Sequence, residues 1–575
     1  MSPVDIQLPR IPNAWRWLTE RVWRVEHAFG RAKAEDRAED DTRLRIFFVL
    51  VIFTAAFLTL AAGAAHSALF AERDRGGPDA AAPGARAELV DRNGLLLAAD
   101  LPHFGLYYDP KENWNPDEIR RVLPAFVPGL SLDRLDKALK ADRRQYLIGG
   151  LTPEERDRID DLGLPGVSFE PEPKRAYLMG PTAGHLIGFV DRGGVGISGA
   201  ELGLDKLIRA DAGKGPVALS IDLRVQAALQ DEVEKAAQNF HAIGAAGIVT
   251  DVHTGEILGM ASYPAFDPNL VGQVPVADMT DHVTSTVYEP GSVFKVFTLA
   301  MGIDSGIADI NTVLDTTTPL VIGSQHIRDD EPSGHNLRLW EVFTHSSNMG
   351  AARLGLKAGG DRLERYFKDF GLWRAAPIEL VETARPLTPR KISDNTVASM
   401  SFGQAISVTP LAIATGMSAI LNGGEYIPLT IRKRGPGDVP VGRRVISQAT
   451  SRTMLDLMRM NATVGTGKGA DAAAPGYRVG GKTGTAQKAI NGRYAVGKRV
   501  SSFAAIFPTD GPMDAPRYFV FILLDEPQPT KDTAGFAMGA QTAAPAAGRV
   551  IERIAPILGV KRAPVVPVAL AKSGN

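Results

Sequence analysis

The chain has 575 residues, which is too many for one hydrophobic core and predicts several structural units. Its formal net charge of −1 provides no long-range field that would favour a nucleic acid or an acidic partner. The chain has no cysteine and no His-x-x-x-His spacing, so disulfides and thiolate catalysis are excluded, and we expect neither a metal site nor a cofactor.

Residues 1–45 are polar and charged, and apolar side chains recur among them at steps of three and four. The stripe consists of Ile11, Trp15, Leu18, Val22, Val25 and Phe29. Such a stripe is typical of a helix lying on the inner surface of a membrane, and it is also compatible with a loosely ordered tail. We interpret these residues as a cytoplasmic segment and leave both structures open.

Residues 46–69 form an apolar run without a charge, long enough to span a hydrocarbon core of about 30 Å. The run begins too far from Met1 for a cleaved signal peptide. Basic residues are more frequent before it (Arg31, Lys33, Arg37, Arg43, Arg45) than after it (Arg73, Arg75). The positive-inside rule therefore predicts a single-pass anchor with a cytoplasmic N-terminus and the rest of the chain outside.

Residues 70–85 are rich in Gly, Pro, Ala and charge, and read as a linker. Residues 86–214 then begin with a predicted β-hairpin around Asn93-Gly94. Helices are expected over 116–123, 132–138 and 153–162, before a turn-rich stretch over 171–199. No combination of residues typical of catalysis occurs in this unit.

Residues 215–560 predict an α+β unit in which a five-stranded, mainly antiparallel sheet is covered by helices. The expected strands are 246–251, 256–262, 478–487, 500–507 and 518–524. The expected helices are 223–238, 292–302, 349–357, 363–370, 451–460 and 542–558. Residues 561–575 read as a C-terminal tail.

The stretch Glu289-Pro290-Gly291-Ser292-Val293-Phe294-Lys295 contains a serine and a lysine three residues apart. On a helix the two side chains share one face, so the lysine can activate the serine hydroxyl once burial lowers its pKa. Pro290 and Gly291 precede an apolar run and predict a helix start with Ser292 in its first turn, where backbone N–H groups favour negative charge.

Two further motifs follow in order. In Ser346-Ser347-Asn348, Ser346 offers a hydroxyl that can pass a proton between Lys295 and a nitrogen, and Asn348 can hold both the lysine and a substrate amide. In Lys482-Thr483-Gly484-Thr485, the lysine adds positive charge, the threonines add hydroxyls, and Gly484 allows a ligand to approach the strand closely. This trio in this order is typical of penicillin-binding proteins and serine β-lactamases.

From about residue 86 to residue 559 the chain resembles a class B penicillin-binding protein, a monofunctional peptidoglycan DD-transpeptidase, and most closely the division-specific FtsI type. Supporting stretches besides the three motifs are Asp91-Arg92-Asn93-Gly94, residues 183–189, residues 196–201, Ser401-Phe402-Gly403-Gln404, Val408-Thr409-Pro410-Leu411, residues 475–481 and Leu523-Leu524-Asp525-Glu526-Pro527. The last two stretches favour the division type.

The resemblance implies that residues 86–214 are a non-catalytic pedestal and residues 215–560 a periplasmic transpeptidase domain, anchored in the bacterial inner membrane. Ser292 would attack the carbonyl between the last two D-alanines of a stem pentapeptide, Lys295 would accept its proton, and Ser346 would pass a proton to the leaving D-alanine. Asn348 and Lys482 complete the expected catalytic set.

Thr483, Gly484 and Thr485 are the expected substrate-binding residues. The resemblance places the oxyanion between the backbone N–H groups of Ser292 and Thr485. The expected ligands are the stem peptides of nascent glycan and β-lactams, which would acylate Ser292. The expected partners are a membrane-embedded SEDS-type glycan polymerase and regulatory division proteins.

Three alternatives remain. An elongation-specific class B transpeptidase would carry the same motifs. A β-lactam hydrolase needs a base for water, and Glu379 and Glu382 are the carboxylates near the expected position, although neither stands out. The non-enzymatic alternative is a β-lactam sensor or an inactive scaffold for a synthase. A sensor would need cytoplasmic signalling machinery, for which the N-terminal segment is short. A second, glycosyltransferase activity is not expected, because the stretch before residue 215 is short for that domain.

Overall fold

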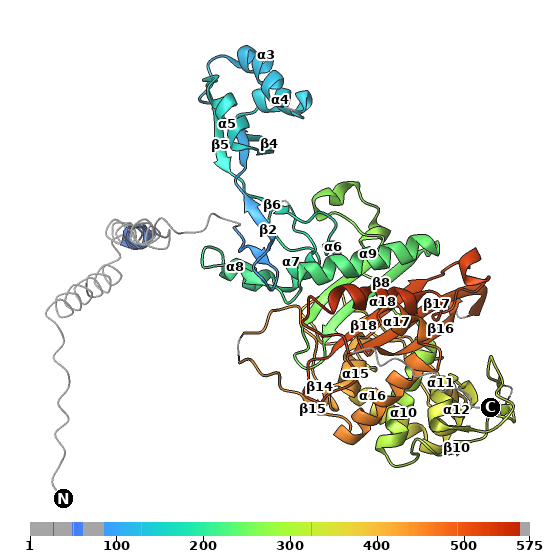
Figure 1. The fold of residues 1–575 in the computed structure, drawn as a ribbon. Coiled ribbons are helices and arrows are strands. Elements are labelled where there is room, and N and C mark those ends of the chain that lie inside the picture. Colours follow the sequence, from blue (N-terminus) through green and yellow to red (C-terminus); the bar gives the residue numbers. More distant parts are fainter. Residues whose placement is uncertain are drawn as a thin grey trace, which may run out of the picture. The chain divides into compact units, whose positions relative to one another are not determined.

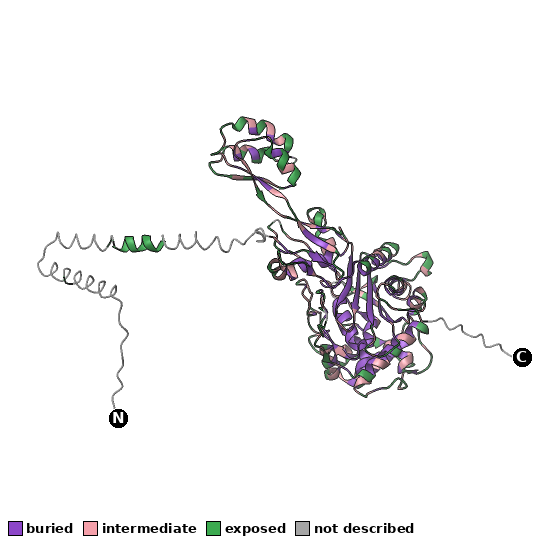
Figure 2. Cartoon of the chain, turned by 60° about the vertical axis from the view of Figure 1, so that its left-hand side comes forward, coloured by how far each residue is buried: buried purple, intermediate pink, exposed green. Residues whose placement is uncertain are grey.

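The computed structural model describes residues 27, 49, 51–60, 85–127, 129–191, 193–323, 325–435, 437–490 and 493–563. The chain divides into two compact units, Met1–Ala81 and Ala82–Asn575. In the first unit, residues 51–60 are helical and exposed (Figure 2). Among the described residues, no helix combines the length and the apolar composition needed to cross a membrane. The predicted membrane helix over 46–69 lies largely outside the described residues.

The second unit begins with a four-stranded sheet in the order β6-β2-β1-β7. Its strands are β1 (Leu89–Val90), β2 (Leu96–Leu101), β6 (Lys174–Tyr177) and β7 (Val217–Ala218). The predicted hairpin at Asn93-Gly94 is confirmed, since β1 and β2 pair antiparallel and Gly94 adopts a φ of 86°. The carboxylate of Asp91 closes the turn by accepting from the backbone N–H groups of Asn93 and Leu95.

A buried ionic cluster lies beside this sheet and includes Arg86, just before β1. Arg86 and Arg175 both bind the carboxylate of Glu201, with N–O distances of 2.6 and 2.7 Å. The Glu201 side chain is fully buried. Arg86 also bonds to Asp205, and its backbone N–H donates to Asp100. Of the short helices that follow α6 (Gly184–Ile187), α7 (Gly199–Gly203) carries Glu201 and α8 (Asp205–Ala210) begins with Asp205.

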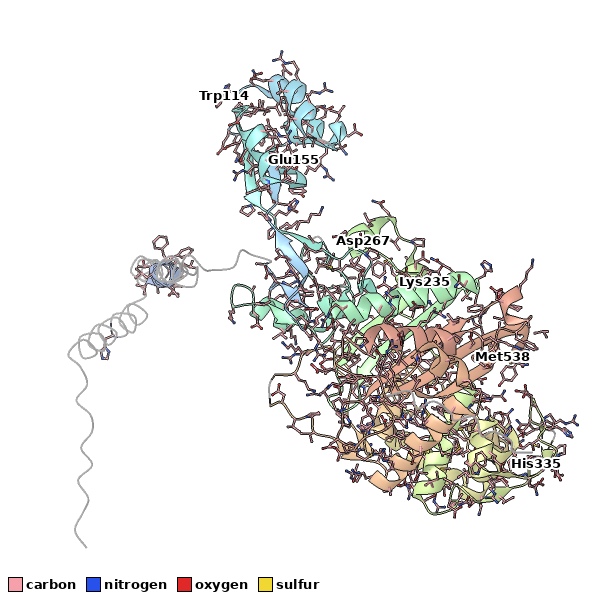
Figure 3. The ribbon with its side chains drawn as sticks, viewed as in Figure 1. Trp114, Glu155, Lys235, Asp267, His335 and Met538 are labelled. Atoms are coloured by element: carbon pink, nitrogen blue, oxygen red, sulfur yellow. The ribbon has the colours of Figure 1, made fainter. Side chains whose placement is uncertain are left out.

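Residues 104–171 form a small α/β body with its own hydrophobic core. Its sheet has the order β4-β3-β5 and consists of β3 (Phe104–Tyr108), β4 (Gln145–Leu151) and β5 (Val167–Pro171). The three predicted helices are confirmed as α3 (Pro116–Phe126), α4 (Leu132–Leu139) and α5 (Pro153–Asp160). Trp114 stands on the surface of this body and is 84% exposed (Figure 3).

The centre of the second unit is a five-stranded sheet in the order β16-β17-β18-β8-β9, in which every neighbouring pair is antiparallel (Figure 1). Its strands are β8 (Gly244–Asp251), β9 (Ile257–Tyr263), β16 (Gly480–Ile490), β17 (Arg493–Phe507) and β18 (Tyr518–Asp525). The predicted five-stranded antiparallel sheet is therefore confirmed. β18 is buried along its whole length, because helices cover both faces of the sheet.

One face of this sheet packs against α9 (Leu223–Asn239) and α18 (Ala543–Ile554), which bury a shared core. The other face packs against α15 (Pro410–Leu421) and, at β16, against α16 (Gln448–Thr463), and α10 (Lys295–Asp304) lies behind these two helices. In Figure 2 the buried residues are concentrated on the sheet and these inner helices. The unit is thus a three-layered α+β structure, as its alternation of strands and amphipathic helices predicts.

The remaining elements flank these layers. They are the helices α11 (Leu339–Thr344), α12 (Asn348–Ala358), α13 (Gly360–Asp369), α14 (Asp394–Met400) and α17 (Lys468–Ala473), the 3₁₀ helices η1 (Pro268–Gln273), η2 (Val276–Met279), η3 (Gly291–Phe294) and η4 (Lys531–Thr533), and the short strands β10 (Val313–Leu314), β11 (Leu320–Ile322), β12 (Gln325–Ile327), β13 (Leu337–Arg338), β14 (Glu425–Tyr426) and β15 (Arg443–Arg444).

Candidate active site

Ser292 and Lys295 lie at the junction of η3 and α10, as the predicted helix start requires. The Lys295 ammonium lies 2.8 Å from the Ser292 hydroxyl. Gly291, directly before the serine, has a φ of 56°, and its N–H donates to the carbonyl of Gly403. A Cβ on Gly403 would lie 2.0 Å from the Gly291 carbonyl oxygen, so this close contact needs a glycine at position 403.

Lys295 is fully buried, and its Nζ is surrounded by oxygen atoms. It donates to Asn348 Oδ1 at 2.7 Å, to Ser346 Oγ at 3.1 Å and to the Ser346 carbonyl. Burial lowers the pKa of Lys295 to about 7, against the opposing influence of the Asp329 and Asp330 charges. Near neutral pH a substantial fraction of this lysine is therefore uncharged and able to accept the serine proton.

Ser346 joins two lysines. Its hydroxyl lies 3.1 Å from Lys295 Nζ and 3.0 Å from Lys482 Nζ. Ser346 has a φ of 58°, a left-handed conformation that non-glycine residues adopt only when their surroundings impose it. Burial, followed by the neighbouring Lys295 charge, lowers the pKa of Lys482 well below its usual range. The arrangement provides a continuous path for a proton from Ser292 through Lys295 and Ser346.

The hydroxyls of Thr483 and Thr485 are held by other parts of the chain. Thr483 Oγ1 lies 2.7 Å from Thr466 Oγ1. Thr485 Oγ1 accepts from the backbone N–H of Gly539 at 3.1 Å, which leaves its own proton free to donate. Gly539 follows Met538, which Figure 3 labels beside the β16–β17 hairpin.

Gly484 is approached closely by the protein's own backbone. A Cβ at this position would lie 2.3 Å from Ser502 Oγ and 2.9 Å from the Pro290 carbonyl oxygen. The absence of a side chain therefore lets η3 pack against β16. This contact brings Ser292 beside the strand that carries Lys482.

The structure thus brings the motif residues to one place. Hydrogen bonds connect Ser292, Lys295, Ser346, Asn348 and Lys482 directly, and Lys482 Nζ also donates to the Thr483 carbonyl. Thr485 joins them through the packing of Gly291 against its carbonyl oxygen.

The two carboxylates considered for a hydrolase lie elsewhere. Glu379 accepts from Thr430 Oγ1 and from the Ile431 N–H, whereas one Glu382 oxygen accepts from the Gly199 N–H. Among the described residues, neither carboxylate forms a hydrogen bond with Ser292 or Lys295. Neither is placed to activate water against an acyl group on Ser292.

Three residues that support the site were not found from the sequence: Asp329, Thr466 and Gly539. Each acts through a contact between segments that are distant along the chain, and no spacing rule marks such a contact. Within the described residues, no group of three or more His, Cys, Asp or Glu side chains could hold a metal ion.

Known families match most of the chain. Residues 245–552 match the penicillin-binding protein transpeptidase domain, and residues 81–239 match the penicillin-binding protein dimerisation domain.

The chain is also similar to named proteins. It is 54% identical to the probable peptidoglycan D,D-transpeptidase FtsI of Caulobacter vibrioides over 95% of this chain and 94% of that one. It is 32% identical to the peptidoglycan D,D-transpeptidase FtsI of Escherichia coli K12, over 81% and 82% of the two chains. Among solved structures, penicillin-binding protein 3 of Mycobacterium tuberculosis in complex with ampicillin is 25% identical, with a TM-score of 0.65 and coverage of 85% and 98%.

Proposed function

Because the chain belongs to the class B penicillin-binding proteins and is a peptidoglycan D,D-transpeptidase of the FtsI type, we propose that Ser292 forms the acyl-enzyme through which it cross-links stem peptides in septal cell-wall synthesis. The observation that carries this assignment is the 2.8 Å contact between the Ser292 hydroxyl and Lys295 Nζ. Lys295 is buried, and its pKa of about 7 suits a general base at neutral pH.

In the first half-reaction, Ser292 Oγ attacks the carbonyl carbon between the last two D-alanines, and its proton passes to Lys295 Nζ. The backbone N–H groups of Ser292 and Thr485 stabilise the oxyanion of the tetrahedral intermediate. The C–N bond then breaks, and a proton passes through Ser346 to the departing amine. Asn348 holds Lys295 through its Oδ1 and offers its amide to the substrate.

In the second half-reaction, the amine of a neighbouring stem peptide attacks the acyl carbon. Its proton follows the same path in reverse, the bond to Ser292 Oγ breaks, and the serine regains its proton. The product contains one new amide cross-link, and the enzyme returns to its initial state.

Residues of β16 bind the terminal carboxylate of the donor peptide. Thr485 donates its free hydroxyl proton, and Thr483, Gly484 and Lys482 complete the binding strand. The carboxylate brings a negative charge beside Lys482 and therefore favours the protonated form of a lysine whose pKa is low in the free enzyme. β-Lactams carry a carboxylate in a comparable place and acylate the same serine.

The proposed location rests on the sequence pattern, and the proposed partners rest on the family resemblance. Residues 46–69 anchor the chain in the bacterial inner membrane, residues 86–214 form the pedestal, and residues 215–560 form the periplasmic transpeptidase domain. The uncharged apolar run and the surplus of basic residues before it support this topology. A SEDS-type glycan polymerase and regulatory division proteins are the proposed partners in the membrane.

Labelling with a fluorescent penicillin tests the nucleophile. We expect the wild-type chain to be labelled covalently and Ser292→Ala to fold but remain unlabelled. Ser305→Ala is the matched control, because Ser305 lies at the far end of α10 and its hydroxyl bonds to the Met301 carbonyl. Stoichiometric labelling of the Ser292→Ala variant would remove Ser292 from the mechanism.

A further inference from the structure

The carboxylate of Asp329 lies directly behind the Ser346-Ser347-Asn348 motif. Asp329 follows β12, and its Oδ2 accepts from Ser347 Oγ at 2.6 Å. Its Oδ1 accepts from the backbone N–H of Met349 at 2.9 Å. One carboxylate therefore binds the residue before Asn348 and the residue after it.

The same segment also contacts Asn348 itself. The Asn348 side-chain amide donates to the Arg328 carbonyl at 3.4 Å, while its Oδ1 accepts from Lys295 Nζ at 2.7 Å. Because the amide nitrogen is directed toward residue 328, the amide oxygen is left to face the lysine. Residues 328 and 329 thus fix both the backbone and the side-chain orientation of Asn348.

The hydrogen bonds of Ser347 also restrain the backbone of Ser346. The Ser347 hydroxyl donates to Asp329 and also accepts from the Gly350 N–H at 3.0 Å, which caps the start of α12. Ser346, one residue earlier, holds its left-handed φ of 58°. A strained backbone of this kind persists only where its neighbours are fixed. The two bonds of Ser347 supply that restraint.

Asp329 is also a charge close to the proposed base. It is half-buried. The charged groups that face Lys295 are Lys482 from β16 and the carboxylates of Asp329 and Asp330 from the loop after β12. Burial lowers the pKa of Lys295, and the two carboxylates act in the opposite direction.

We propose that Asp329 is a positioning residue for the transpeptidase reaction. Its carboxylate holds Ser346 and Asn348 in place through its hydrogen bonds to Ser347 and Met349. Its negative charge acts on Lys295. This proposal rests on the proposed roles of Ser292 and Lys295. It extends the functional site to the loop between β12 and β13, which the three sequence motifs do not include.

The test is the pH profile of acylation by one penicillin, measured on the full-length chain in detergent. Asp329→Asn keeps the shape of the side chain, but an amide has only one acceptor oxygen for two donors. We expect the plateau rate to fall by about tenfold, as for the loss of one hydrogen bond to a charged group. The acid limb of the profile, where the acylation rate rises with pH, should also move to lower pH. Removing a negative charge lowers the pKa of Lys295, and this lysine must be uncharged to act as the base.

Two variants separate position from charge. Asp330→Asn removes a charge that acts on Lys295 but none of the bonds to Ser347 or Met349, so it should move the acid limb to lower pH and leave the plateau within about twofold of wild type. Ser347→Ala keeps the Asp329 charge and removes one bond, so it should lower the plateau and leave the acid limb in place. Thermal unfolding of each variant verifies that it is folded.

The proposal is overturned if folded Asp329→Asn retains a wild-type plateau, or if Asp330→Asn lowers the plateau equally. Should Asp329→Asn not fold, a wild-type plateau in Ser347→Ala overturns it instead. The proposed nucleophile is tested separately. Penicillin labelling of Ser292→Ala would contradict the role of Ser292. If Ser292→Ala is unlabelled and Asp329→Asn has a wild-type pH profile, only the role of Asp329 is contradicted.

Discussion

Two buried lysines lie on either side of one serine hydroxyl, and this arrangement determines how charge is distributed in the free enzyme. Burial lowers the pKa of both Lys295 and Lys482, so the site avoids holding two ammonium groups around Ser346. In the proposed mechanism, a substrate carboxylate would bring a negative charge beside Lys482 and favour its protonated form. The affinity for an anionic donor peptide would then be coupled to the protonation of Lys482.

Thr485 provides a test of carboxylate recognition. Thr485→Val keeps the shape of the side chain and the backbone N–H but removes the hydroxyl proton that the Gly539 contact leaves free. A hydrogen bond to a charged group contributes about 1.5–3 kcal/mol. We therefore expect the second-order acylation rate for one penicillin to fall by about ten- to a hundredfold.

The control for this experiment is Thr463→Val, because the Thr463 hydroxyl is exposed on α16 and bonds only to backbone carbonyls of its own helix. Its acylation rate should match that of wild type. A change of less than about twofold in Thr485→Val, well below the loss of one such bond, would show that the carboxylate is held elsewhere.

At the scale of elements, the glycine contact between η3 and the 401–404 stretch is a packing constraint. Gly403→Ala would force a Cβ to within 2.0 Å of the Gly291 carbonyl oxygen at a φ of 87°. We expect it to destabilise the fold by more than about 3 kcal/mol and to slow acylation, because η3 carries Ser292. Chemical denaturation and penicillin acylation measure the two effects.

Gly437 offers a matched comparison, since it has a φ of 88° and no atom within 4 Å of the position that a Cβ would occupy. Gly437→Ala should lower the free energy of unfolding by only about 1 kcal/mol through backbone strain and leave acylation unchanged. Equal losses in the two variants would mean that the contact with Gly291 contributes nothing.

The elements also show how far the sequence predicts this fold. The strands β8 and β18 were predicted because buried strands read as short apolar runs between turns. The first half of β17 was not, because residues 494–499 are mostly exposed and the apolar run begins only at Val500. The dipeptide Asn491-Gly492 is favoured in tight hairpins and was the sequence signal that could have indicated this part of the strand.

α15 was missed for the opposite reason. All twelve of its residues are buried, so it shows no amphipathic period by which a helix is recognised. In the candidate site, the motif residues were predicted because their chemistry is local to short stretches. Asp329 and Gly539 were not, because their roles depend on tertiary contacts alone.

At the scale of the whole molecule, the proposed anchor should do more than tether. The run 46–69 contains Ala55, Ala56, Ala61, Ala62 and Gly63, small residues that permit close packing between helices in a membrane. If they pack on a glycan polymerase, exchange of the run for an unrelated membrane helix of equal length should keep penicillin binding but fail to restore division in a depleted strain. Full complementation would show that the segment only tethers.

The ionic cluster around Glu201 determines how the second unit withstands a mechanical load. Arg86 precedes every strand of the second unit along the chain and forms an ion pair with Glu201, so tension applied to the residues before it meets this cluster before any strand of the central sheet. Separating one partner from a buried ionic cluster leaves an uncompensated charge and costs about 3–5 kcal/mol. If residues 46–69 anchor the chain as proposed, a pull from that side would first load Arg86, Glu201 and Arg175.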